Sequence, residues 1–179
     1  MMTTRREALL AGATGLLAGP ATATKKVSNA GHVATLVRLS AQANSALMRG
    51  DIDTYRSLMT YSGDFTFMSP FGGLPKRRND FTEERMQGMG QFFRNGVFDQ
   101  ELIEAYSADD LVVLVMVERQ SVEVGGLPMQ EWPLRVTLVY RREGPDWQLA
   151  HRHADPLFHE IGLEGAAALA RGAPLVDHR

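Results

Sequence analysis

Residues 111–117 read Leu-Val-Val-Leu-Val-Met-Val, an unbroken run of seven apolar side chains. Successive side chains of a β-strand point to opposite faces, so a strand of this composition needs burial on both of them. Such a strand belongs in the middle of a sheet that is covered on each side. The run therefore predicts a central strand, which needs neighbouring strands in the sheet and a cover on each of its faces.

Strand patterns surround this run. Looser alternation at 98–106 precedes it, and strand patterns at 132–140 and 147–154 follow it, the last two joined by a Glu-Gly-Pro-Asp turn. An earlier segment, 64–68, also alternates and ends in a Ser-Pro-Phe-Gly-Gly turn. The order predicts a meander of long strands preceded by one early strand.

Helical spacing dominates the segment before the long strands. Residues 28–48 place apolar side chains at intervals of three and four, and Gly50 is suited to end this helix. Asp51 is suited to cap a short second helix, and Asp80 a third helix at 81–94. We expect the three helices to cover one face of the sheet. A second copy of the chain most simply covers the other face, which predicts a homodimer through the sheet.

Composition excludes several classes of protein. The chain has 179 residues, a net charge of −2 and no cysteine. Its length fits one domain with a small appendage. Basic and acidic residues are mixed along the sequence, which argues against a nucleic-acid binder, because such a protein needs a basic face. A sequence without cysteine excludes disulfides, thiolate metal sites and a cysteine nucleophile.

The first 23 residues follow the order of an export signal. Arg5 and Arg6 stand in a context that resembles the twin-arginine export pattern, and 8–18 form a mildly apolar stretch. About eleven residues are too few to cross a bilayer, which needs roughly twenty. Pro20 then breaks any helix, and the small residues 21–23 suit a signal peptidase. The alternative is an amphipathic N-terminal helix of a cytoplasmic protein, which leaves the arginine pair and the small-residue site unexplained.

Three local stretches, taken in order, resemble the nuclear transport factor 2-like superfamily, which includes SnoaL-like proteins and ketosteroid isomerases. Residues 49–53 resemble its turn between the first two helices, 64–72 its strand and Pro-x-Gly turn, and 147–153 its closing strand. The resemblance covers residues 30–157. It implies an α+β fold in which a cone-shaped, curved, mixed or antiparallel sheet wraps around N-terminal helices, a cystatin-like α+β roll. It also implies a conical cavity that holds a small apolar molecule.

The catalytic positions of two relatives are absent. Ketosteroid isomerases place a general-base aspartate directly before the Pro-x-Gly turn, where this chain has Ser69. Their oxyanion-donating tyrosine falls at Ala43, and its partner aspartate near 136–138, which read Val-Thr-Leu. Limonene-epoxide-hydrolase-like chemistry needs an aspartate two residues beyond an arginine, but Arg135 is followed by Thr137. The resemblance therefore does not extend to steroid isomerisation by the aspartate mechanism.

The sharpest polar cluster lies on the last strand. With a period of two, Trp147, Leu149, His151, His153 and Asp155 share one face. Because Trp147 and Leu149 must be buried, we expect this face to line the cavity, where imidazoles and a carboxylate suit acid–base work. His153 would move the proton, with Asp155 or His151 orienting it. The alternative is that His153 is a hydrogen-bonded wall residue and Asp155 caps the strand end.

Two further sets of charged residues have more than one interpretation. Arg135 could stabilise developing negative charge with Glu118 orienting it, or the two could pair across neighbouring strands on the dimer face. The basic run 76–78 is either a solvated rim or a lid over an anionic ligand. A metal site that adds His159 to the histidine pair is weakly indicated, because no clear carboxylate ligand accompanies it.

We divide the chain into a twin-arginine signal peptide (1–23), a SnoaL-like domain (24–157) and a C-terminal helix or tail (158–179), with helical spacing at 158–171. The domain is expected to bind a small, largely apolar molecule without cofactor or metal. If it is an enzyme, the reaction is a cofactor-free isomerisation, cyclisation, dehydration or hydration; the alternative is a non-catalytic binding or association module. The expected ligand-binding residues are Tyr55, Asp64, Phe67, Ser69, Phe93, Glu118, Trp132 and Trp147.

Overall fold

The structure is a computed structural model and describes residues 29–172. It begins with two helices, α1 (Asn29–Met48) and α2 (Ile52–Leu58). Gly50 follows α1 with a φ of 81°, a left-handed conformation that glycine adopts without strain. Asp51 then caps α2 by accepting a hydrogen bond of 3.0 Å from a backbone amide of the first turn. Both roles agree with the sequence prediction.

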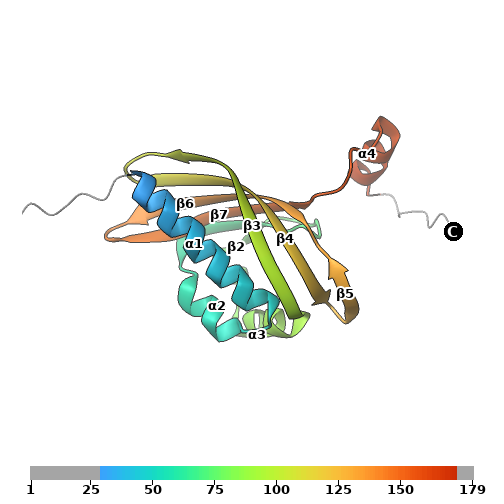
Figure 1. Cartoon of the computed structure of the whole chain (residues 1–179), viewed down its shortest axis with the longest axis horizontal. Helices are drawn as coiled ribbons and strands as arrows, with labels where there is room; N and C mark the ends of the chain where they lie inside the picture. Colours follow the sequence, from blue (N-terminus) through green and yellow to red (C-terminus); the bar gives the residue numbers. More distant parts are fainter. Residues whose placement is uncertain (1–28, 173–179) are drawn as a thin grey trace, which may run out of the picture.

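Seven strands form one mixed sheet, and α1 lies across one of its faces (Figure 1). β1 and β7 run parallel, and the remaining strand pairs of this sheet are antiparallel. The α+β fold, with N-terminal helices against a mixed sheet, is therefore confirmed. In spatial order the strands are β2 (Lys76–Arg77), β1 (Tyr61–Met68), β7 (Asp146–Pro156), β6 (Leu134–Glu143), β4 (Leu111–Val124) and β3 (Phe93–Ser107), with β5 (Leu127–Glu131) pairing with β4 beyond this path.

The apolar run that defines the fold lies in β4. The even-numbered residues of this strand, from Val112 to Val124, are buried against the helical side. Val113, Val115 and Val117 point to the opposite face and stay partly exposed. Within one chain, β4 is therefore buried on one face only, and burial of its second face by another copy stays a prediction. The partly exposed side is the outer face, where we expected a second copy.

Irregular pairing helps to bend the sheet around α1. β3 carries extra residues opposite β4 near Asn95, whose φ is 54°, and at Ile103. An extra residue of this kind increases the local twist of a strand pair. At Gly96 a side chain would begin 2.8 Å from the carbonyl oxygen of Met48, so glycine allows β3 to approach the end of α1.

A bulge in β7 determines which of its side chains face the inside of the sheet. Leu149 and His151 pair with consecutive residues of β6, so Ala150 is an extra residue in β7. A bulge of this kind reverses the alternation of side chains beyond it. Leu149 is buried on the inner face before the bulge, and Arg152 and Ala154 face inward after it.

Two helices are shorter than predicted. α3 spans Glu83–Phe92, and its cap is Thr82, whose hydroxyl accepts a backbone hydrogen bond at 3.2 Å. Asp80 instead ends the preceding 3₁₀ turn, η1 (Arg78–Asp80), and its carboxylate accepts a hydrogen bond from the backbone amide of Arg77, the N-cap of that turn. Its predicted role as the cap of α3 is therefore wrong. α4 spans Leu163–Ala170 and lies apart from the sheet in Figure 1.

The predicted signal peptide, residues 1–23, lies outside the described residues, and so does the end of the predicted tail. Within residues 29–172, no helix combines the length and the apolar character needed to cross a membrane.

Candidate functional site

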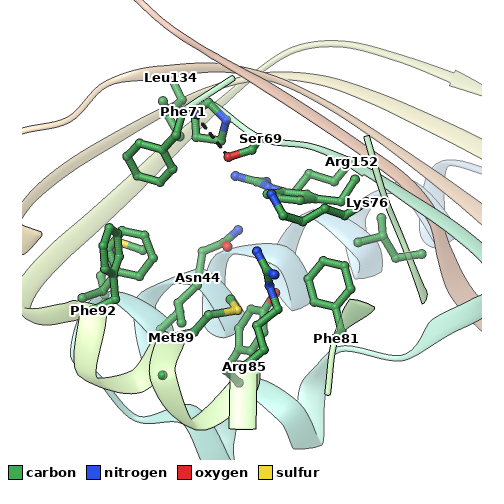
Figure 2. Close-up of a pocket in the computed structure, with 18 of the residues that line it drawn as sticks. Asn44, Ser69, Phe71, Lys76, Phe81, Arg85, Met89, Phe92, Leu134 and Arg152 are labelled. Carbon is green, nitrogen blue, oxygen red and sulfur yellow. Dashed lines mark hydrogen bonds between the residues drawn. The ribbon is translucent and has the colours of Figure 1, made fainter. Parts of the chain in front are cut away.

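A cavity of about 640 Å³ lies between the helices and the inner face of the sheet (Figure 2). Elements far apart in sequence build it, from α1 to β7. This volume is in the range of pockets that hold small molecules of a few rings. Most of the wall is apolar, and its aromatic members are Tyr55, Tyr61, Phe65, Phe67, Phe71, Phe81, Phe92, Phe93 and Trp132.

The polar part of the wall includes a buried ion pair between two strands. Arg152 of β7 donates two hydrogen bonds to Glu118 of β4, from Nη1 to Oε1 at 2.8 Å and from Nη2 to Oε2 at 2.7 Å. Their side chains are only 15% and 2% exposed. Asn44 of α1 donates to Glu118 Oε1 at 3.3 Å and to the Ser40 hydroxyl at 3.4 Å. This paired geometry fixes the guanidinium plane at the cavity wall.

The pair is neutral as a whole. Burial alone disfavours the charged form of Arg152, but the charge and hydrogen bonds of Glu118 outweigh it and raise the pKa of the guanidinium. Arg152 therefore stays protonated. Its N–H hydrogens that do not bind Glu118 are donors suited to a carbonyl or hydroxyl oxygen of a ligand.

Two phenols share the same cavity. The hydroxyl oxygens of Tyr55 in α2 and Tyr61 in β1 lie 2.7 Å apart. Burial raises the pKa of both phenols, and the nearby Tyr55 raises that of Tyr61 further. Both remain protonated near neutral pH, so they act as hydrogen-bond partners rather than as bases.

The mouth of the cavity carries charged side chains that are exposed or half-buried. They are Lys76 of β2 and, from α3, Glu84 and Arg85. The Lys76 Nζ atom lies 6.0 Å from the ring centroid of Phe67, and the Arg85 Cζ atom 5.8 Å from that of Phe81. These distances allow cation–π attraction, which holds both cations against rings of the cavity wall.

The predicted acid–base cluster is not part of this cavity. Because Ala150 is an extra residue, His151, His153 and Asp155 project from the outer face of the sheet. There, His153 Nε2 lies 3.3 Å from Asp155 Oδ2, and His151 Nδ1 lies 2.6 Å from the Thr66 hydroxyl oxygen. Burial, and then the neighbouring His153, lower the pKa of His151. The expectation that the last strand sends its imidazoles into the cavity is wrong.

Arg135 and Glu118 also separate. Glu118 is opposite Leu134 in the strand register, so Arg135 projects to the outer face while Glu118 points inward. Arg135 Nη2 instead lies 3.9 Å from Asp155 Oδ2, and both side chains are well exposed. Neither interpretation that joined Arg135 to Glu118 describes this geometry.

Within the described part of the chain, the weakly indicated metal site has no geometric support. Across residues 29–172, no group of three or more histidine, aspartate or glutamate side chains is placed to hold an ion. The histidines of the outer face therefore do not form the three-histidine site that the sequence weakly indicated.

Six of the eight expected ligand-binding residues line the cavity: Tyr55, Phe67, Ser69, Phe93, Glu118 and Trp132. Asp64 lies at the surface, where Arg141 binds its carboxylate with two hydrogen bonds of 2.8 and 3.0 Å. Trp147 packs against His32 of α1, with ring centroids 5.4 Å apart, and does not line the cavity.

Sequence reasoning missed several residues of the cavity wall. A strict period of two assigns Arg152 to the outer face, so its place in the wall could not be predicted without the bulge. Gln120 was predictable, because it stands two residues after Glu118 on the same strand face. Apart from its charge, nothing in the sequence indicated that Arg85 lines the cavity. Lys76 belongs to the basic run 76–78, for which the sequence allowed two interpretations.

Comparisons with known proteins agree with this architecture. The SnoaL-like domain profile matches residues 37–158, and no curated protein matches the chain. Among solved structures, a dehydratase candidate of the NTF2-like family from Streptomyces avermitilis aligns with a TM-score of 0.60 at 17% identity, over 74% of this chain and 100% of that one. An NTF2-like protein of unknown function from Pseudomonas putida gives a TM-score of 0.58 at 24% identity, and the alignment covers 74% of this chain and 91% of that one. A protein with a cystatin-like fold from Caulobacter vibrioides gives a TM-score of 0.56 at 14% sequence identity, and the alignment covers 80% of this chain and 98% of that one.

Proposed function

The chain belongs to the SnoaL-like family, and from that premise we propose that its cavity binds a small, largely apolar molecule built on one or more rings. The aromatic wall supports this, because flat rings pack against aromatic faces and leave water when they do so. The volume of about 640 Å³ accommodates a molecule of two or three fused rings.

One observation carries the proposal: the Arg152 guanidinium lies at the wall of a mostly apolar cavity and is already neutralised by Glu118. A polar group inside an apolar pocket orients a ligand, because the ligand must satisfy it or lose affinity. Arg152 is suited to hold an uncharged oxygen, since Glu118 cancels its net charge. The bound molecule is therefore expected to present a carbonyl or hydroxyl to this part of the wall.

A blocked cavity tests the proposal. Met89 lines the cavity, whereas Met129 of β5 is 49% exposed and does not. Met89→Trp should fill part of the space, and Met129→Trp is the matched control. By isothermal titration calorimetry, 2-acetylnaphthalene should bind the wild type and M129W equally, and M89W at least about tenfold more weakly. No binding to the wild type, or equal binding to a folded M89W, contradicts the proposal.

A second candidate function is cofactor-free acid–base conversion of the bound molecule, as an isomerase, cyclase or dehydratase. The observation in its favour is the hydrogen-bonded Tyr55–Tyr61 pair in the same cavity as Glu118 and Arg152. In such a reaction the Glu118 carboxylate would take a proton from a carbon next to a carbonyl. Arg152 or a phenol would donate a hydrogen bond to the enolate oxygen, and the proton would then return to another atom.

Deuterium uptake separates this chemistry from simple binding. In D₂O, a catalytic cavity should exchange the methyl protons of 2-acetylnaphthalene faster than buffer does, as followed by NMR. Glu118→Gln should remove the acceleration. Saturable binding without faster exchange supports the alternative, a non-catalytic binding module.

The outer face of the sheet is proposed as the surface of a homodimer. Val113, Val115, Val117 and Val139 form half-exposed apolar rows on it, and a face of this kind gains stability when a second copy covers it. Val115→Lys should convert a dimer into a monomer in sedimentation velocity. Leu74→Lys, at a loop residue 87% exposed, should leave the dimer intact. A wild type that sediments as a monomer contradicts the proposal.

Export is proposed from the sequence of residues 1–23. We propose that the mature protein works in the periplasm or outside the cell. Replacing both Arg5 and Arg6 with lysine should retain the precursor in the cytoplasm, as seen by fractionation and immunoblotting. Arg38→Lys, in α1, is the control and should not alter export. Unchanged export of the double variant contradicts the twin-arginine route.

A further inference from the structure

We infer that the ligand of this cavity is a monoanion whose carboxylate lies at the mouth, between Lys76 of β2 and Arg85 of α3. The inference rests on the proposed function, because it names the class of molecule that the cavity binds. That class is small ring-containing carboxylic acids that carry a hydrogen-bond donor elsewhere on the ring system.

The charges around the cavity do not cancel. The cations of the lining are Lys76, Arg85 and Arg152, and the carboxylates are Glu84 and Glu118. Arg152 and Glu118 neutralise each other through two direct hydrogen bonds. Neither Lys76 nor Arg85 takes part in an ion pair within residues 29–172. One positive charge is left over, which matches one negative charge on a ligand better than none or two.

The two cations at the mouth come from different elements. Figure 2 shows Lys76 and Arg85 reaching into the cavity from β2 and from α3, with Arg152 entering from β7. The rings beneath the first two, Phe67 and Phe81, belong to the same wall. A ligand whose ring system packs against Phe67 and Phe81 would therefore carry its carboxylate within reach of both cations.

A second, independent observation indicates a ligand. Gln120 of β4 is 4% exposed and lines the cavity, and its Oε1 atom accepts no hydrogen bond from the described part of the chain. A buried acceptor without a donor is unfavourable and uncommon in folded proteins. Gln120 lies on the inner face of the sheet, two residues from Glu118. A hydroxyl or N–H group on the ligand would satisfy this oxygen.

Probes of one shape and three charges test the inference. By calorimetry at low salt, the wild type should bind 2-naphthoate about tenfold more tightly than the neutral 2-naphthamide. The dianionic 2-naphthyl phosphate should bind no better than 2-naphthoate. Added salt should reduce the preference, because exposed charges are screened within about 8 Å at physiological ionic strength.

Matched charge variants locate the effect. Lys76→Gln with Arg85→Gln should abolish the preference for 2-naphthoate and leave the affinity for 2-naphthamide almost unchanged. Arg38→Gln with Arg77→Gln removes the same charge from exposed positions outside the lining and should keep the preference. A preference that survives in the K76Q/R85Q protein overturns the inference.

The comparison of the three probes on the wild type does not depend on the folding of any variant. It therefore tests the inference even if the K76Q/R85Q protein does not fold. Equal binding of 2-naphthoate and 2-naphthamide overturns the inference and leaves the proposed function intact. Tighter binding of 2-naphthyl phosphate overturns the assignment of a monoanion. If none of the three probes binds, both the inference and the proposed function are wrong.

Discussion

Replacing Glu118 with leucine should lower the free energy of unfolding by about 3–5 kcal/mol, because it leaves the buried Arg152 guanidinium without its counter-charge. Glu118 is 2% exposed and Arg152 15%, so water cannot fully replace the carboxylate. The variant loses hydrogen bonds of 2.7 and 2.8 Å and the acceptor that Asn44 uses. Arg152 cannot escape the penalty by losing its proton, since arginine does not deprotonate in proteins.

A double-variant cycle measured by urea unfolding at neutral pH isolates the interaction. The proteins are the wild type, E118L, R152M and E118L/R152M. The double variant should recover most of the stability lost in E118L, because apolar side chains of similar size can replace a buried ion pair at little cost. A loss below about 1 kcal/mol in E118L, or a coupling free energy below about 0.5 kcal/mol, refutes the idea that this pair is desolvated and mutually dependent.

Three further variants test other parts of the structure by thermal or chemical unfolding. Gln120→Met should stabilise the protein by about 1 kcal/mol, since it removes a buried acceptor that has no donor; a loss of stability argues that Gln120 is satisfied. Hydrogen bonds from Arg141 lower the pKa of Asp64, so the carboxylate stabilises the fold above pH 3.8 and this contribution fades as the pH falls further. Asp64→Asn should therefore be less stable than the wild type at pH 7, with a gap that shrinks in acid; a constant gap contradicts this. Gly50→Ala should cost more than about 1 kcal/mol, because φ is 81° and the new Cβ would lie 2.8 Å from the Gly90 carbonyl oxygen; a neutral effect argues against this tight contact.

The helices and strands were largely predictable because their signals are local. The spacing of apolar residues in 28–48, the glycine at position 50 and the aspartate at position 51 each act within a few residues, and α1 and α2 follow them. The start of α3 was harder to predict. Asp80 and Thr82 are both good capping residues, and only the 3₁₀ turn before the helix decides between them.

The site was less predictable, because one residue in β7 changes the face to which its neighbours point. The aromatic and hydroxyl positions near Ser69, Phe93 and Trp132 follow from the order of elements and do line the cavity. The histidines do not, since the bulge at Ala150 depends on the pairing of β7 with β6, which no single stretch of sequence reveals. Errors of register therefore affect polar residues most, because their role depends entirely on the face they occupy.

The same bulge that turns the histidines outward brings Arg152 inward. Under the proposed function, this arrangement would let one part of the cavity supply affinity and another part select the charge of the ligand. At the inner wall, Glu118 cancels the charge of Arg152, so an apolar ring can approach without stripping water from an unpaired ion. At the mouth, Lys76 and Arg85 are closer to solvent, where a ligand's charge is attracted but also screened by salt. Burial of the ring should therefore supply most of the affinity at any ionic strength, and the mouth should select among rings of equal shape by their charge.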